Sequence, residues 1–269
     1  MPIGVIGGSG LCSLPELEVT QEVELITPYG EPSDTVTIGT YAGVRIAFVP
    51  RHGSQHGIPP HRVPYKANLF ALKSLGVRSV LATCVAGSLK REIEPGTFVV
   101  PDQFINLTWG RDDSYEHDRG FIHLPMAQPY CQTLAHALGG ALQKLALPHQ
   151  KTGTVVVIQG PRFSTIAESR MYALWGGDMV NMTQYPECYF ARELGICYSV
   201  LSSITDYDVG VSSDIAMKQG SFERVIPVFK SNIELTKQVL AQALQHCAQF
   251  LHCGCADAEI RPYYSSVTP

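Results

Sequence analysis

Long apolar runs are absent from this 269-residue sequence, and no run approaches the length of a membrane span. The N-terminus has no basic segment followed by a long apolar one, so no secretion signal is visible. Charged residues are scarce at 16%, and the net charge of −4 gives no reason to expect nucleic acid or a membrane as a partner. With an apolar fraction of 45%, the composition excludes a disordered chain and indicates a compact soluble enzyme. Since no secretion signal or membrane span is visible, we expect a cytoplasmic protein.

Internal repeats, low-complexity segments and Ser/Gly linkers are also missing, so we expect one domain over residues 1–252 and a C-terminal tail over residues 253–269. Short apolar runs rich in Val and Ile alternate with helical patterns, which predicts an α/β fold around a mixed or largely parallel sheet. In such folds ligands bind beyond the C-terminal ends of the strands. The predicted strands are residues 2–7, 35–41, 44–50, 77–85, 96–102, 152–159, 178–182 and 196–204, and the predicted helices are residues 65–76, 131–147, 165–176, 185–195 and 224–251.

A glycine-rich turn, GGSG, follows the first predicted strand but lacks what two familiar nucleotide loops require. Counted from Gly8, a dinucleotide fingerprint needs a third glycine or alanine where Ser13 stands. A triphosphate loop needs a lysine, and the first lysine of the chain is Lys66. The turn can still bind a small anion through its N–H groups and the Ser9 hydroxyl, and the alternative is a turn without a ligand.

A second segment, RHGSQHGIPPHR, is rich in basic side chains but contains no Asp, Glu or Cys to complete a typical metal site. Anion binding fits it better, because arginine binds phosphate oxygens with paired donors. A solvated basic loop is the alternative. Its basic residues are Arg51, His52, His56, His61 and Arg62.

Small polar groups follow three more predicted strands, in the segments ATCVAGSL, VNMTQYPE and SSITDYDVG. The last contains Asp206 and Asp208 directly after a very apolar strand. This pair is a candidate for acid chemistry or polar ligand recognition, and a surface turn is the alternative.

Most of the eight cysteines lie in apolar segments, where reduced, buried thiols are expected: Cys12, Cys84, Cys131, Cys188 and Cys197. Cys253 and Cys255 differ, because they form a Cys-Gly-Cys motif after the last predicted helix. A zinc site would need further ligands, and only Cys247 and His252 lie close in sequence. Two interpretations of this motif stay open: a redox pair or disulfide, and an ordinary exposed tail.

The chain resembles the trimeric purine nucleoside phosphorylases, and among them most closely the 5′-methylthioadenosine phosphorylases. The resemblance spans about residues 3–226 and rests on GGSG, PRHGSQH, PYKANLFALKSLG, AGSL, IQGPRFST, VNMTQYPE and SSITDYD in this order. It implies a single α/β domain with a central mixed β-sheet flanked by helices, assembled as a homotrimer or a dimer of trimers. It also implies phosphorolysis of 5′-methylthioadenosine in purine and methionine salvage, with inorganic phosphate as co-substrate and neither metal nor organic cofactor.

The resemblance assigns a phosphate site to residues of four segments. Backbone amides near Cys84 and Val85 would complete it, although close relatives more often have Thr and Ala at these two positions. A thiol is a poorer donor than a hydroxyl, which puts one phosphate contact in question. The implied side-chain ligands are Ser9, Arg51, His52 and Thr183.

The nucleoside site is implied in the same way. Phe163 would pack on the purine and the backbone of Met182 would contact the ribose hydroxyls. Asp206 would donate a proton at purine N7, which an apolar pocket favours by raising its pKa. Asp208 would accept from the 6-amino group of adenine, whereas 6-oxopurine enzymes have Asn where Asp206 stands.

The 5′ end of the substrate would contact apolar side chains, which suit a methylthio group. By resemblance these are Phe222, Val225 and Ile226, and His123 would reach the pocket from a neighbouring subunit. Two alternatives remain for the whole chain: a phosphorylase of 6-oxopurine nucleosides or methylthioinosine, and a non-catalytic nucleoside-binding relative.

Overall fold

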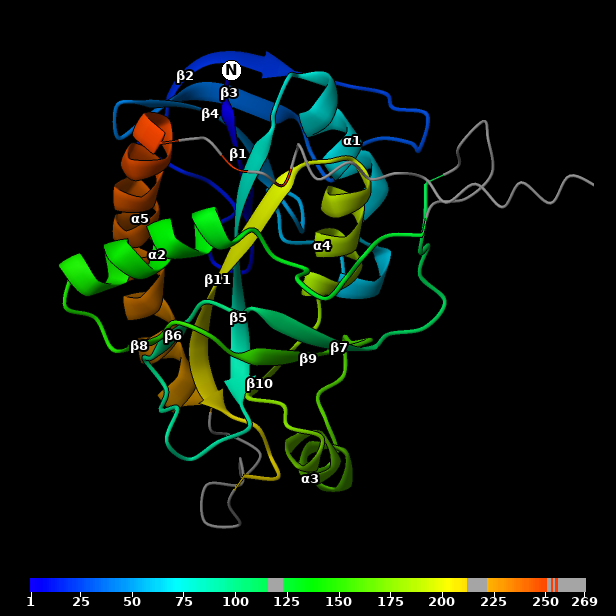
Figure 1. The fold of residues 1–269 in the computed structure, drawn as a ribbon, viewed down its shortest axis with the longest axis vertical. Helices are drawn as coiled ribbons and strands as arrows, with labels where there is room; N and C mark the ends of the chain where they lie inside the picture. Colours follow the sequence, from blue (N-terminus) through cyan, green and yellow to red (C-terminus); the bar gives the residue numbers. More distant parts are fainter. Residues whose placement is uncertain (116–122, 212–221, 251–252, 254, 256–269) are drawn as a thin grey trace, which may run out of the picture.

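The computed structural model describes residues 1–115, 123–211, 222–250, 253 and 255, and of residues 222–226 and 249–250 it describes the backbone alone. Its centre is a sheet in which eleven strands of the described residues take part (Figure 1). No helix in these ranges is long and apolar enough to cross a membrane. The strands are β1 (Ile3–Gly7), β2 (Glu18–Val23), β3 (Val36–Tyr41), β4 (Val44–Pro50), β5 (Ser79–Ser88), β6 (Phe98–Val99), β7 (Gln103–Leu107), β8 (His149–Gln150), β9 (Thr154–Ile158), β10 (Met179–Asn181) and β11 (Cys197–Tyr207).

Strand β5 organises the sheet, because three strands pair with it. Strands β1 and β11 are parallel to β5, and β10 is antiparallel to its C-terminal end. The sheet continues from β1 through β4, β3 and β2, and from β10 through β9 and β7. This mixture of parallel and antiparallel pairs confirms the predicted α/β class and the mixed sheet.

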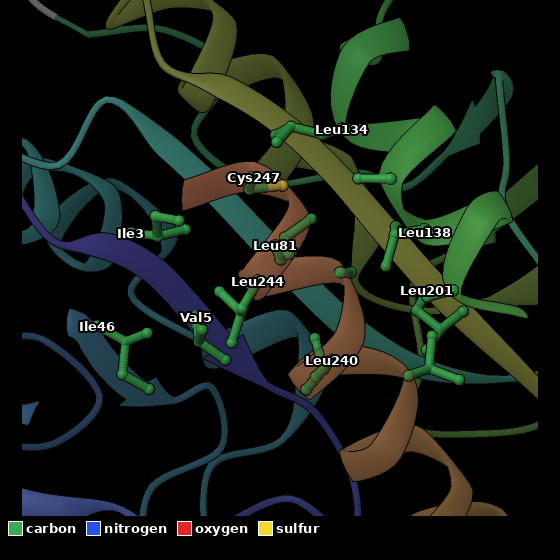
Figure 2. Packing of buried hydrophobic residues seen from close by; sticks show 14 of the residues in the cluster. Ile3, Val5, Ile46, Leu81, Leu134, Leu138, Leu201, Leu240, Leu244 and Cys247 are labelled. Carbon is green, nitrogen blue, oxygen red and sulfur yellow. The ribbon is translucent and has the colours of Figure 1, made fainter. Parts of the chain in front are cut away.

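Helices cover both faces of the sheet, as the apolar runs predict. In β1, Val5 packs in one core with α2 and α5, and the next residue, Ile6, packs in a second core with α1 and α4. Figure 2 shows the first core, in which α5 residues Leu240 and Leu244 lie against Val5. The helices are α1 (Tyr65–Ser74), α2 (Gln132–Lys144), α3 (Ile166–Leu174), α4 (Gln184–Glu193) and α5 (Phe222–Phe250), with a short 3-10 turn η1 (Pro60–Arg62).

The sequence did not predict β2, β7 or β8. Strand β2 pairs with β3 at the sheet edge, and its sequence EVTQEV is almost entirely exposed, so it has no apolar face to mark it. The predicted strand at residues 96–102 is reduced to Phe98–Val99. The other predicted helices and strands are present with ends shifted by a few residues.

Candidate active site

A cavity of about 410 Å³ lies at the C-terminal ends of β1, β4 and β9 and beside the C-terminal parts of β5, β10 and β11. The ends of these strands and the loops after them line it, which is where an α/β sheet is expected to bind ligands. The cavity brings together residues from segments far apart in sequence. The predicted residues that line it are Ser9, Arg51, His52, Cys84, Val85, Phe163, Met182, Thr183, Asp206 and Asp208.

The GGSG turn holds Ser9 at the cavity through close backbone packing. A Cβ atom on Gly8 would lie 2.3 Å from the carbonyl oxygen of Thr83 and 2.7 Å from Nη1 of Arg51, so only glycine fits. The Gly8 N–H donates to Oγ1 of Thr83 at 3.0 Å. Gly10 has φ of 84°, the left-handed region that glycine adopts at little cost. The glycines therefore allow this turn to pack closely against β5 and Arg51.

Arg51 is buried in an ion pair that the sequence did not reveal. Its Nε and Nη2 each donate to a carboxylate oxygen of Glu187 at 2.6 Å, and its Nη1 donates to the Thr83 carbonyl at 2.7 Å. Arg51 is 1% exposed, and the hydroxyl of Tyr198 donates to the same carboxylate at 2.7 Å. Burial opposes the charge on Arg51, but the Glu187 carboxylate raises its pKa above the ordinary value. The guanidinium is thus fixed, permanently charged and already neutralised by Glu187.

His52 lies beside Arg51 as a neutral imidazole. Its Nδ1 is 2.8 Å from the carbonyl oxygen of Ile58, which only accepts hydrogen bonds, so Nδ1 carries the proton. Burial and the neighbouring Arg51 lower the pKa of His52 to about 4. The other ring nitrogen is therefore an acceptor, which suits the O–H of a protonated phosphate.

The Cys84 thiol faces a buried polar network. Its Sγ is 3.2 Å from Oγ of Ser202, and it accepts from Nδ2 of Asn181 at 3.3 Å and from Nε2 of Gln184 at 3.4 Å. Since the thiol has these three contacts, any contribution of this position to anion binding falls to the backbone.

The backbone of β5 is open to the cavity beside the thiol. Among the described strands, β1 pairs with β5 up to Ala82 and β10 pairs with it from Gly87, which leaves residues 83–86 unpaired on that edge. Peptide groups of alternate residues point to the same edge of a strand. The Thr83 carbonyl accepts from Arg51 at this edge, so the N–H of Val85 points there too.

Thr183 completes this side of the cavity from the start of α4. It is the N-cap residue of that helix, it is 6% exposed, and it lines the same cavity as Ser9 and Arg51. The chain is non-helical at Tyr185 (φ −110°, ψ 135°), so Thr183 offers its hydroxyl to the cavity and not the end of a helix dipole. Together these residues offer donors that suit a small anion.

Two carboxylic acids lie at the other end of the cavity, where β11 ends. Burial raises the pKa of Asp206, and the nearby Asp208 raises it further. A hydrogen bond that Asp206 accepts from the Thr205 hydroxyl at 2.6 Å opposes this shift. Burial also raises the pKa of Asp208, against the effect of the nearby Ser169 and Ser164 hydroxyls. Both acids therefore hold a proton to higher pH than free aspartic acid.

Asp208 has unused hydrogen-bonding capacity in this buried place. Its Oδ2 and the Oγ of Ser164 have no hydrogen-bond partner among the described residues, although both atoms are buried. Both residues line the cavity. Because buried polar atoms are nearly always paired, these two are expected to meet a polar ligand.

Arg111 joins the loops that carry Phe163 and Met182, and no local sequence pattern marks it. Its guanidinium donates to the carbonyl oxygens of Met182 at 3.0 Å, Tyr185 at 2.6 Å and Gln159 at 2.8 Å. Phe163 lies at the mouth of the cavity and is 59% exposed, so its ring is accessible to a flat ligand.

The remaining predicted residues are not tested by this cavity. Phe222, Val225 and Ile226 lie in the first turns of α5, where the side chains are outside the described part. His123 is exposed and is not among the cavity-lining residues of its own chain. Its assignment to a neighbouring subunit stays a prediction.

Comparison with known proteins identifies the family. The sequence model of the Phosphorylase superfamily matches residues 2–245. The chain belongs to this superfamily. It is 43% identical over 256 residues to the S-methyl-5′-thioadenosine phosphorylase of Nitrosopumilus maritimus, covering 95% of each chain. It is 46% identical over 252 residues to the Mycobacterium tuberculosis protein of the same name, covering 93% of this chain and 91% of that protein.

Solved structures show the same fold. The methylthioadenosine phosphorylase of Schistosoma mansoni in complex with adenine superposes with a TM-score of 0.86 at 33% identity, covering 93% of this superfamily member and 92% of that chain. Its complex with tubercidin gives a TM-score of 0.88 at 33% identity, with 96% and 95% coverage. These TM-scores show that the chain shares the fold of these solved structures.

Proposed function

We propose that the protein is a pentosyltransferase that cleaves 5′-methylthioadenosine with inorganic phosphate, giving adenine and 5-methylthioribose 1-phosphate. One observation carries the proposal: the same cavity is lined by Ser9 and Arg51, which can bind an anion, and by the buried Asp208, whose Oδ2 has no hydrogen-bond partner among the described residues. Relatives named S-methyl-5′-thioadenosine phosphorylase support the choice of nucleoside.

The phosphate site supplies donors for most of the phosphate oxygens. Ser9, Thr183 and the Val85 N–H contribute neutral donors, and Arg51 contributes a charged one held in place by Glu187. The neutral His52 accepts from the phosphate O–H through the ring nitrogen that does not bond Ile58. Because the Arg51 charge is already balanced, binding depends on these directed hydrogen bonds as well as on charge.

The reaction transfers the ribose C1′ from nitrogen to oxygen. A phosphate oxygen bonds to C1′ as the C1′–N9 bond breaks, and the electron pair of that bond moves into the purine. Burial raises the pKa of Asp206. In its protonated form this acid donates to N7 of the departing base, and the proton lost from phosphate restores the balance. Our proposal includes neither a metal nor an organic cofactor in these steps.

Adenine is distinguished from 6-oxopurines by the direction of one hydrogen bond. The Oδ2 of Asp208 can accept from the 6-amino group, whereas a 6-oxo group offers another acceptor. The mismatch leaves a buried polar group unpaired, which costs about 1–3 kcal/mol.

The activity test is incubation with methylthioadenosine, adenosine, methylthioinosine and inosine, each with and without phosphate. Adenine should be released from methylthioadenosine only when phosphate is present. Hypoxanthine as the sole product would assign the protein to the 6-oxopurine class. No release from any substrate would indicate a non-catalytic binding protein.

We further propose a cytoplasmic homotrimer, or a dimer of trimers, acting in purine and methionine salvage, with His123 completing the pocket of a neighbouring subunit. Light scattering tests the assembly through the mass of the particle. In a trimer, His123→Ala should raise KM for methylthioadenosine and leave the particle mass unchanged; a monomeric mass contradicts the assembly.

A further inference from the structure

The Cys-Gly-Cys motif meets two cysteines that lie far from it in sequence. The possible metal ligands near Cys253 in sequence are Cys247 and His252, of which His252 lies outside the described residues. In the structure the partners of Cys253 and Cys255 are Cys131 and Cys197. All eight cysteines are free thiols.

The four sulfur atoms form one compact group. All of them lie within 4.8 Å of one another, and Sγ of Cys131 is 3.2 Å from Sγ of Cys253. A tetrahedral zinc ion with bonds of about 2.3 Å places its four sulfur ligands about 3.8 Å apart. Thiolate sulfur is the ligand that zinc prefers in structural sites, and four cysteines complete its coordination.

The cysteines come from three elements of the first core. Cys131 is the N-cap residue of α2, Cys197 begins β11, and the motif follows α5. The N–H of Cys131 donates to the Tyr198 carbonyl at 2.8 Å, which joins the starts of α2 and β11. Both motif cysteines are partly buried against the core that contains these two elements.

One backbone donor supports the group, because the N–H of Cys255 donates to Sγ of Cys253 at 3.3 Å. Cys131 and Cys197 are 2% and 4% exposed, so one side of the group is closed to water.

We propose that Cys131, Cys197, Cys253 and Cys255 bind one structural zinc ion, which fixes the chain after α5 to the starts of α2 and β11. The site is separate from the cavity, since none of its ligands lines that space. With four protein ligands it has no open position for substrate, so its role is in stability.

The test measures metal and thiols in the full-length protein purified without chelator or added reductant. Mass spectrometry should find about one zinc per chain, and all eight thiols should react after denaturation in chelator. Cobalt substitution should give the intense charge-transfer absorption of a tetrahedral thiolate site. Fewer than eight thiols with no zinc would indicate a disulfide and overturn the proposal, and iron in place of zinc would contradict the choice of metal.

Two variants test whether zinc binding depends on these four cysteines and not on a neighbouring thiol. Cys253→Ser with Cys255→Ser should reduce zinc to below about a tenth of an ion per chain, because two ligands do not hold the metal tightly. Cys247→Ala is the matched control, since this thiol is buried in the same core and is not one of the four. It should keep full zinc. Zinc retained in the double variant would overturn the proposal, and the cobalt spectrum of the wild type tests it even if that variant fails to fold.

Discussion

The buried pair of Arg51 and Glu187 makes a quantitative prediction. In Glu187→Gln the side chain keeps its shape, but the carboxylate that accepts two hydrogen bonds from Arg51 and one from Tyr198 is lost. Arg51 is then a buried charge without its counter-ion. Removing one partner of such a pair costs about 3–5 kcal/mol, because the remaining charge stays desolvated. We expect the free energy of unfolding to fall by about this amount.

The matched control is an exposed pair with similar geometry. Arg162 donates to Glu168 at 2.6 and 2.8 Å, but the arginine side chain is 67% exposed. Glu168 also belongs to the capping box of α3, in which Gln can replace it. Glu168→Gln should therefore cost about 0–1 kcal/mol.

Urea denaturation of both variants without phosphate tests the contrast. A loss in Glu187→Gln no larger than that in Glu168→Gln would refute the reasoning. It would mean that Arg51 finds another partner or water when Glu187 is neutral, and that the anion site is not held by this pair.

Three further predictions concern the cavity. Burial and Arg51 lower the pKa of His52 from 6.5 to about 4. The free energy of unfolding present above pH 6.5 should therefore fall as the pH drops toward 4, because the unfolded state binds the proton first. In urea titrations over this range the wild type should lose more of this free energy than His52→Gln. Equal losses would contradict a neutral, buried His52. Asp206→Asn combined with Asp208→Ala removes the acceptor for the 6-amino group. The ratio of kcat/KM for methylthioadenosine to kcat/KM for methylthioinosine should therefore fall on the order of 100-fold. An unchanged ratio would show that the two aspartates do not select the purine. Arg111→Lys should lower kcat about 10- to 100-fold with an unchanged far-ultraviolet spectrum, because lysine cannot hold three carbonyl groups in one geometry. Full activity in this variant would show that the two loops keep their positions without the clamp.

The sequence predicts elements whose side chains are buried on both faces and misses those that are not. β1, β5 and β11 are almost wholly buried, so their apolar runs mark them. β2 is exposed and polar, and its place is fixed by pairing with β3 instead of by its own pattern. Local patterns thus predict the centre of the sheet better than its edge.

The same holds for the site: local sequence patterns mark some of its residues, but not the contacts between residues far apart in sequence. Arg51 and Asp208 stand in segments that the sequence marks, because both follow predicted strands at the place where an α/β sheet binds ligands. Glu187 lies 136 residues from Arg51, and no local spacing connects them. The four-cysteine group was missed for the same reason, since α2, β11 and the chain after α5 meet only in the folded core.

The central claim is that phosphate itself attacks the sugar, and isotope labelling tests it most directly. The protein is incubated with methylthioadenosine and phosphate labelled with ¹⁸O at every oxygen, and the products are analysed by mass spectrometry. Our account predicts adenine and a sugar phosphate in equal amounts, with all of the label retained in the sugar phosphate. Unlabelled free methylthioribose released at the same rate with and without phosphate would contradict it.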